Sequence, residues 1–123
     1  MARTEKLRTR LVTLEDEFAE LLARELEREA TGGHSTYLAR KTPYLLDGKR
    51  YRRPEVGHIE QLERQVRALR TQLGDAMDAG PIVVLDGYIE ATATVESRIT
   101  GGLTRAARLA LAQLSKPKAK VRR

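Results

Sequence analysis

Residues 7–33, LRTRLVTLEDEFAELLARELEREATGG, decide the fold because their apolar side chains recur at helical spacing. Alternating steps of four and three residues join Leu7, Leu11, Leu14, Phe18 and Leu21. This stripe predicts an amphipathic helix, and the Gly-Gly pair predicts its end, since glycine commonly follows a helix C-terminus. The stripe either packs within the chain or forms a coiled coil between chains, because about two heptads fit both arrangements.

A second helix is predicted from Pro54 to Ala79. Proline suits the first position of a helix, and Gly80-Pro81 closes the segment. Its apolar positions again alternate by three and four residues: Ile59, Leu62, Val66, Leu69 and Leu73. Two amphipathic helices of similar length are expected to pack as an antiparallel helical hairpin.

A third helix is predicted from Leu103 to Leu114, with an apolar face that uses either Leu109 or Ala110 at its centre. The residues that follow, KPKAKVRR, offer almost no apolar surface and are expected to be disordered. The predicted domain organisation is therefore a single domain over 1–115 and a basic tail over 116–123.

Two Asp-Gly pairs, at 47–48 and 86–87, predict short β-hairpins, because Asp-Gly favours the two-residue turn that joins antiparallel strands. The first would pair Tyr44 with Tyr51. In the second, polar and apolar side chains alternate from Ile89 to Thr100, which favours a strand. A helix over 82–100 is the alternative. The predicted fold is mainly α, with a small α+β fold as the variant: a helical hairpin, a C-terminal helix and one or two β-hairpins.

The net charge of +6 is concentrated in two segments. Residues 40–53 hold six cations and one anion, and residues 116–123 hold five cations and no anion, whereas the rest of the chain is mildly acidic. Charge gathered in this way typically marks an interaction surface. The candidate nucleic-acid-binding residues are the cations and tyrosines of these segments: Arg40, Lys41, Tyr44, Lys49, Arg50, Tyr51, Arg52, Arg53, Lys116, Lys118, Lys120, Arg122 and Arg123.

Reaction chemistry finds no support in the sequence. The chain has no cysteine, and His34 and His58 are not spaced to share a metal ion. No pair of carboxylates or activated nucleophile is indicated. We therefore expect a protein that is not an enzyme and has no metal or cofactor. The charged N-terminus and the lack of a long apolar run predict neither a secretory signal nor a membrane span, which favours a cytoplasmic protein.

The expected function is non-enzymatic binding of DNA or RNA. Arginine and lysine would hold the phosphate backbone, and tyrosines among them would stack on bases. The alternative is a structural or adaptor subunit of a multi-chain assembly, such as a viral or secretion particle or a coiled-coil oligomer. In that case the apolar seams would contact neighbouring subunits, and the basic tail would contact an acidic protein surface.

Overall fold

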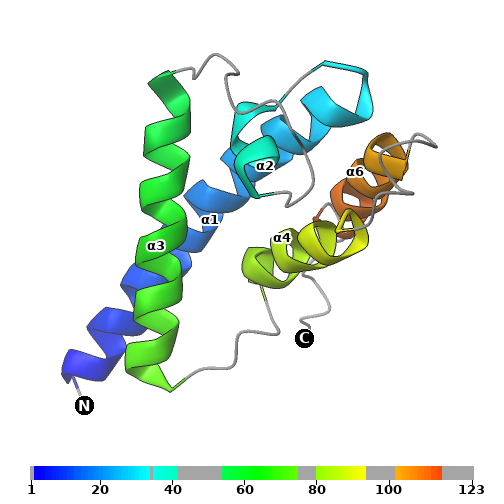
Figure 1. Ribbon diagram of the computed structural model, residues 1–123. Coiled ribbons are helices and arrows are strands. Elements are labelled where there is room, and N and C mark those ends of the chain that lie inside the picture. Colours follow the sequence, from blue (N-terminus) through cyan, green and yellow to red (C-terminus); the bar gives the residue numbers. More distant parts are fainter. Residues whose placement is uncertain (1, 34, 42–53, 75–79, 94–101, 115–123) are drawn as a thin grey trace.

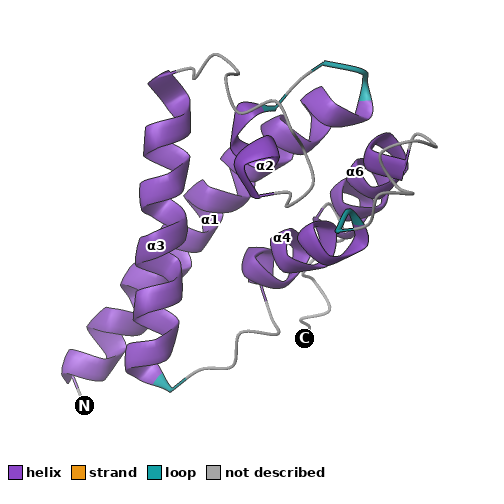
Figure 2. Cartoon of the chain, viewed as in Figure 1, coloured by secondary structure: helices purple, strands orange, loops and turns teal. Residues whose placement is uncertain are grey.

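The structure is a computed structural model that describes residues 2–33, 35–41, 54–74, 80–93 and 102–114. The regular elements of these residues are all helices (Figures 1 and 2). They are α1 (Ala2–Ala30), α2 (Thr36–Lys41), α3 (Pro54–Leu73), α4 (Gly80–Ala91) and α6 (Gly102–Leu114). The predicted helical core is confirmed.

Helix α1 is the centre of the fold and contacts each of the other four helices in the described part of the chain. Helix α3 lies along α1 and runs in the opposite direction, as predicted, while α4 and α6 pack on another side of α1 (Figure 1). An ion pair between Arg70 Nε and Glu15 Oε2, at 2.6 Å, joins the two helices of the hairpin. The short helix α2 contacts both α1 and α3.

One apolar core joins the five helices that the structure describes. The predicted stripe of α1 faces this core, with Leu11 and Phe18 buried, so the stripe packs within the chain. Leu22 and Leu26, in the following turns of α1, are fully buried as well. At the centre of α6 it is Ala110 that is buried, while Leu109 points outward and is 63% exposed. The other buried apolar side chains include Tyr37, Leu38, Val56, Ile59, Leu62, Val66, Leu69, Ile82, Leu85, Tyr88, Ala106 and Ala107.

The end of α1 lies where the Gly-Gly pair predicts it. Gly32 has a φ of 91°, in the left-handed region that glycine adopts without strain. The amide of Gly33 donates to the carbonyl of Arg28 at 2.8 Å, and the amide of Gly32 donates to that of Glu29 at 3.3 Å. This pattern is a Schellman motif, which satisfies the last carbonyl groups of the helix.

Helix α3 begins at Pro54 as predicted but ends at Leu73, six residues before the predicted end at Ala79. Gly74 has a φ of 76°, and its amide donates to the carbonyl of Thr71 at 3.1 Å. A left-handed glycine stops helix propagation there. The apolar residues beyond Gly74 continue the helical pattern, which explains why the sequence predicts a longer element.

Helix α2 was not predicted, and a side-chain cap explains its start. Ser35 Oγ accepts a hydrogen bond from the amide of Leu38 at 3.0 Å, the pattern of an N-cap serine. The same hydroxyl donates to Glu25 Oε1 at 2.9 Å, so the cap is itself tied to α1. This arrangement places Tyr37 and Leu38 in the core.

The β-hairpin predicted within 82–100 is wrong, because residues up to Ala91 form α4 and the described residues contain no strand. Ile82, Leu85 and Tyr88 are buried at helical steps of three, so tertiary burial outweighs the cost of about 1 kcal/mol for glycine in a helix. Gly87 itself lies on the exposed side of α4.

The hairpin predicted around Asp47-Gly48 and the tail predicted at 116–123 lie outside the described residues. Of the helices that the structure describes, none has the length and apolar character needed to cross a membrane.

Candidate nucleic-acid interface

The basic segment 40–53 starts in the last turn of α2 and ends where α3 begins, at Pro54. Arg40 and Lys41 are the last two residues of α2. The other predicted binding residues lie outside the described part of the chain: Tyr44, Lys49, Arg50, Tyr51, Arg52, Arg53, Lys116, Lys118, Lys120, Arg122 and Arg123. The structure therefore places the start of the basic segment and brings none of these eleven side chains together.

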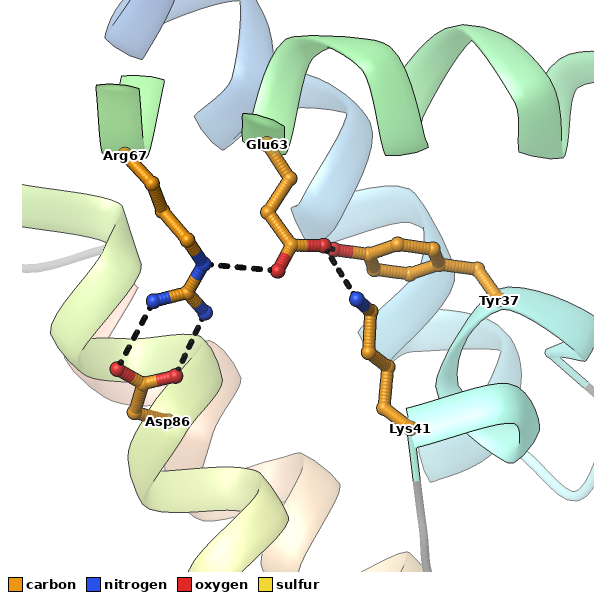
Figure 3. A network of polar contacts seen from close by, with 5 residues as sticks. All are labelled: Tyr37, Lys41, Glu63, Arg67 and Asp86. Carbon is orange, nitrogen blue, oxygen red and sulfur yellow. Dashed lines mark hydrogen bonds and ion pairs between the residues drawn. The ribbon is translucent and has the colours of Figure 1, made fainter. Parts of the chain in front are cut away.

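Lys41 is the predicted binding residue whose side chain the structure describes. Its Nζ atom lies 2.8 Å from Glu63 Oε1 and 5.5 Å from the centre of the Tyr37 ring (Figure 3). The side chain is 28% exposed. Lys41 thus forms an ion pair with a carboxylate of α3. This ion pair holds the end of α2, where the basic segment begins, against α3.

Glu63 is the centre of a polar network in which three side chains donate to one carboxylate. Tyr37 Oη donates to Oε1 at 2.6 Å, and Arg67 Nε donates to Oε2 at 3.0 Å, in addition to the Lys41 ion pair (Figure 3). Burial favours a raised pKa of Glu63, but the hydrogen bonds from Lys41, Tyr37 and Arg67 outweigh it and lower the pKa below the ordinary value. Glu63 is therefore an ionised acceptor although it is only 5% exposed.

Tyr37 is fully buried and contributes a hydroxyl that remains a donor. Burial raises the pKa of this hydroxyl well above its ordinary value, and the hydrogen bond to Glu63 raises it further, because a phenolate beside a carboxylate would be strongly repelled. Tyr37 is therefore a neutral anchor and not a proton-transfer group.

Arg67 extends the network from α3 to α4. Its Nη2 atom donates to Asp86 Oδ1 at 2.8 Å and its Nη1 atom to Asp86 Oδ2 at 3.4 Å, which is the two-pronged geometry typical of arginine and carboxylate. The hydrogen bond to Asp86 raises the pKa of Arg67, with burial acting in the opposite direction. The network therefore joins α2, α3 and α4.

This network is suited to holding α2, α3 and α4 in position, because each charged group in it already faces a partner of opposite charge. The described residues contain no group of three or more side chains able to hold a metal ion. Nε2 of His58 lies 3.1 Å from Glu17 Oε2 at an exposed site between α3 and α1. His34 lies outside the described residues.

Sequence reasoning missed this network, although two signals were present. Glu63 follows Leu62 and lies three residues before Val66 on the apolar side of α3, a position that could have indicated a buried carboxylate. Arg67 lies four residues further on, the spacing of a helical ion pair. The partners Tyr37, Lys41 and Asp86 come from other helices, and no local pattern identifies them.

A second surface feature lies between α4 and α6. A shallow, mainly apolar groove of about 200 Å³ is lined by residues that include Gly87, Tyr88, Ala106 and Leu109. Small side chains on both helices leave this groove open, and the exposed Leu109 stands at its edge.

Comparisons of the chain with protein-family models, with curated proteins and with solved structures found no match. A functional proposal therefore depends on the residues and their geometry.

Proposed function

We propose that this chain is a non-enzymatic nucleic-acid-associated protein that holds the phosphate backbone through residues 40–53 and 116–123. The observation that carries the proposal is the separation of charge: each of the two segments has a net charge of +5 in a chain whose total is +6. Such clusters favour polyanions, and a large part of the affinity of proteins for nucleic acids comes from cations that displace counterions.

The composition of segment 40–53 supports this choice of ligand. Arginine forms two parallel hydrogen bonds to a phosphate group more readily than lysine does, and Arg50, Arg52 and Arg53 follow one another closely. Tyr44 and Tyr51 supply aromatic rings of the kind that stack on unpaired bases.

The Glu63 network supports the proposal mechanically. Lys41 is tied to the middle of α3 by the ion pair to Glu63, and the segment ends at the first residue of the same helix. A rigid base reduces the conformational entropy that is lost when a segment is ordered on a ligand.

The test is the dependence of affinity on salt, measured by fluorescence anisotropy with a labelled 24-base-pair duplex and a single strand of equal length. The slope of log affinity against log salt should be steep for the intact chain, about −0.9 per phosphate neutralised on duplex. The variant R50Q/R52Q/R53Q and removal of residues 116–123 should each make the slope shallower by about two or more.

A matched control removes three exposed cations elsewhere, in R28Q/R105Q/R108Q, and should leave the slope close to that of the intact chain. The proposal is contradicted if neither DNA nor RNA binds at low salt, or if the control variant loses as much as R50Q/R52Q/R53Q.

The groove between α4 and α6 favours a second candidate function, a subunit of a multi-chain assembly. An apolar groove beside the exposed Leu109 is a surface that another chain can cover. Light scattering tests this candidate: self-association should be nearly independent of salt and should be weakened by Leu109→Asp. A monomer at all concentrations would exclude association between copies through this groove.

A further inference from the structure

Charges along α1 are distributed unevenly. Its first nine residues carry four cations and one anion, whereas residues 15–30 carry seven anions and two cations. This order is the reverse of what the helix dipole favours, since anions are stabilised near the N-terminus and cations near the C-terminus. The net charge of residues 1–39 as a whole, −2, conceals this separation.

Three of the cations form a row on one side of α1. Arg3, Lys6 and Arg10 are separated by three and four residues, which places them along one face of a helix. All three side chains are exposed, and none makes a hydrogen bond or ion pair to a residue that the structure describes. Arg8 lies on another side of the helix and has an interaction of its own.

Three other arginines of the hairpin differ from this row because they form ion pairs. Arg24 is paired with Glu20, Arg67 with Asp86 and Arg70 with Glu15. Those three contribute to the internal electrostatics of the fold. In the row, by contrast, Lys6 and Arg10 are like charges four residues apart, which is a destabilising arrangement on a helix.

We propose that the row Arg3–Lys6–Arg10 is a third phosphate-binding element, which contacts the backbone of the same nucleic acid as the two basic segments. This inference rests on the proposed function. The row extends over eight residues, or about 10 Å along the helix axis, and one strand of a duplex presents about three phosphates over that distance. The helix thus holds three cations at a spacing that fits three successive phosphates.

The position of the row also indicates how long the ligand has to be. It lies at the end of the hairpin where α1 begins and α3 ends, whereas the basic segment joins α3 at its other end (Figure 1). Helix α3 has 20 residues, so these two ends are about 30 Å apart. A ligand that contacts both ends of α3 would extend along the hairpin, and a duplex of 24 base pairs, about 80 Å long, is long enough to do so.

The test compares R3Q/K6Q/R10Q with the control R28Q/R105Q/R108Q, which loses the same charge from exposed positions on α1 and α6. With the 24-base-pair duplex, the row variant should make the salt slope shallower by about 2–3, and the control by less than about 1. The conservative variant R3K/R10K should retain the slope. The melting temperature of R3Q/K6Q/R10Q should equal or exceed that of the intact chain, because a repulsive arrangement is removed.

Equal slopes for the row variant and the control would overturn the inference. If R50Q/R52Q/R53Q still weakens binding in that case, the proposed function stands and only the third element is lost. If the intact chain does not bind the duplex at any salt concentration, the proposed function fails, and the inference fails with it.

Discussion

Two tyrosines are buried in the core, and they differ in whether their hydroxyl groups have a partner. Tyr37 donates to the Glu63 carboxylate at 2.6 Å. Tyr88 is 2% exposed and its hydroxyl makes no hydrogen bond to a described residue. Burial raises the pKa of Tyr88 above its ordinary value, so this hydroxyl is neutral at physiological pH.

The pair gives a matched test of the Glu63 network. Tyr37→Phe should lower the free energy of unfolding by about 1.5–3 kcal/mol, because it removes a buried hydrogen bond to a charged acceptor. Tyr88→Phe removes the same atom without breaking a hydrogen bond to a described residue, so it should not lower the free energy of unfolding. Urea unfolding followed by circular dichroism measures both changes. Equal losses of unfolding free energy would show that the hydrogen bond from Tyr37 to Glu63 does not stabilise the fold.

Glu63 should make stability depend on pH in a defined direction. Its pKa is lowered in the folded state, so the unfolded chain binds a proton more readily at acid pH. The stabilisation is therefore complete above the ordinary glutamate pKa of about 4.3 and is lost as pH falls through the lower folded pKa.

Glu63→Gln should cost about 1–3 kcal/mol at pH 7, because Lys41 and Arg67 lose their shared carboxylate. The difference between the variant and the intact chain should shrink as pH is lowered from 5 to 3. Urea unfolding at four pH values measures this difference, with Glu27→Gln, at an exposed site on α1, as the control. A difference that is constant with pH would contradict the ionised state assigned to Glu63.

At the scale of elements, glycine substitutions distinguish α4 from the hairpin that the sequence favoured. Gly87 has no positive φ in α4, and a Cβ atom there would meet nothing within 4 Å. Gly87→Ala should therefore stabilise the protein by about 0.5–1 kcal/mol through helix propensity. In the turn of a hairpin the same change would destabilise, since the glycine of an Asp-Gly turn needs a positive φ.

Gly74→Ala is the control with the opposite expected sign. A Cβ atom at Gly74 also meets nothing within 4 Å, but the φ of 76° is strained for alanine. The change should cost about 1 kcal/mol or more. Thermal unfolding of both variants tests the assignment, and a destabilised Gly87→Ala would argue against helix α4.

The sequence predicted the long amphipathic helices well because their periodicity and caps are local. The stripe of α1, the Gly32 cap, the start of α3 at Pro54 and the third helix are all confirmed. The errors occur where tertiary contacts outweigh local preference. Asp86-Gly87 resembles a turn, but Asp86 is held by Arg67, and the residues on either side are buried against other helices.

At the scale of the whole molecule, the sequence predicted only those parts of the candidate interface that have a clear excess of positive charge. The two basic segments are evident in the sequence because counting charges needs no structure. The row on α1 was overlooked because the acidic part of the same helix cancels its charge. The pairing of Lys41 with Glu63 could not be predicted, since the two residues are far apart in sequence and meet only when α2 packs on α3.

The ion pair between Lys41 and Glu63 also sets the distance that residues 42–53 have to bridge. Glu63 lies nine residues into α3, about 14 Å from Pro54 along the helix axis. Thirteen peptide steps from Lys41 to Pro54 can reach about 40 Å. Residues 42–53 are therefore much longer than the distance between Lys41 and Pro54 requires.

Ring-closure entropy then predicts that the length of this segment has little effect on the helices. Inserting twelve Gly and Ser residues between Asp47 and Gly48 doubles it and should cost only about 0.6 kcal/mol, with helical circular dichroism unchanged. Lys41→Ala, which removes the ion pair to Glu63, should lower the free energy of unfolding by more than this insertion does. Loss of helical signal on insertion would contradict this picture. Because the ion pair between Lys41 and Glu63 holds the end of α2 on α3, residues 42–53 can vary in number and kind while the helices keep their packing.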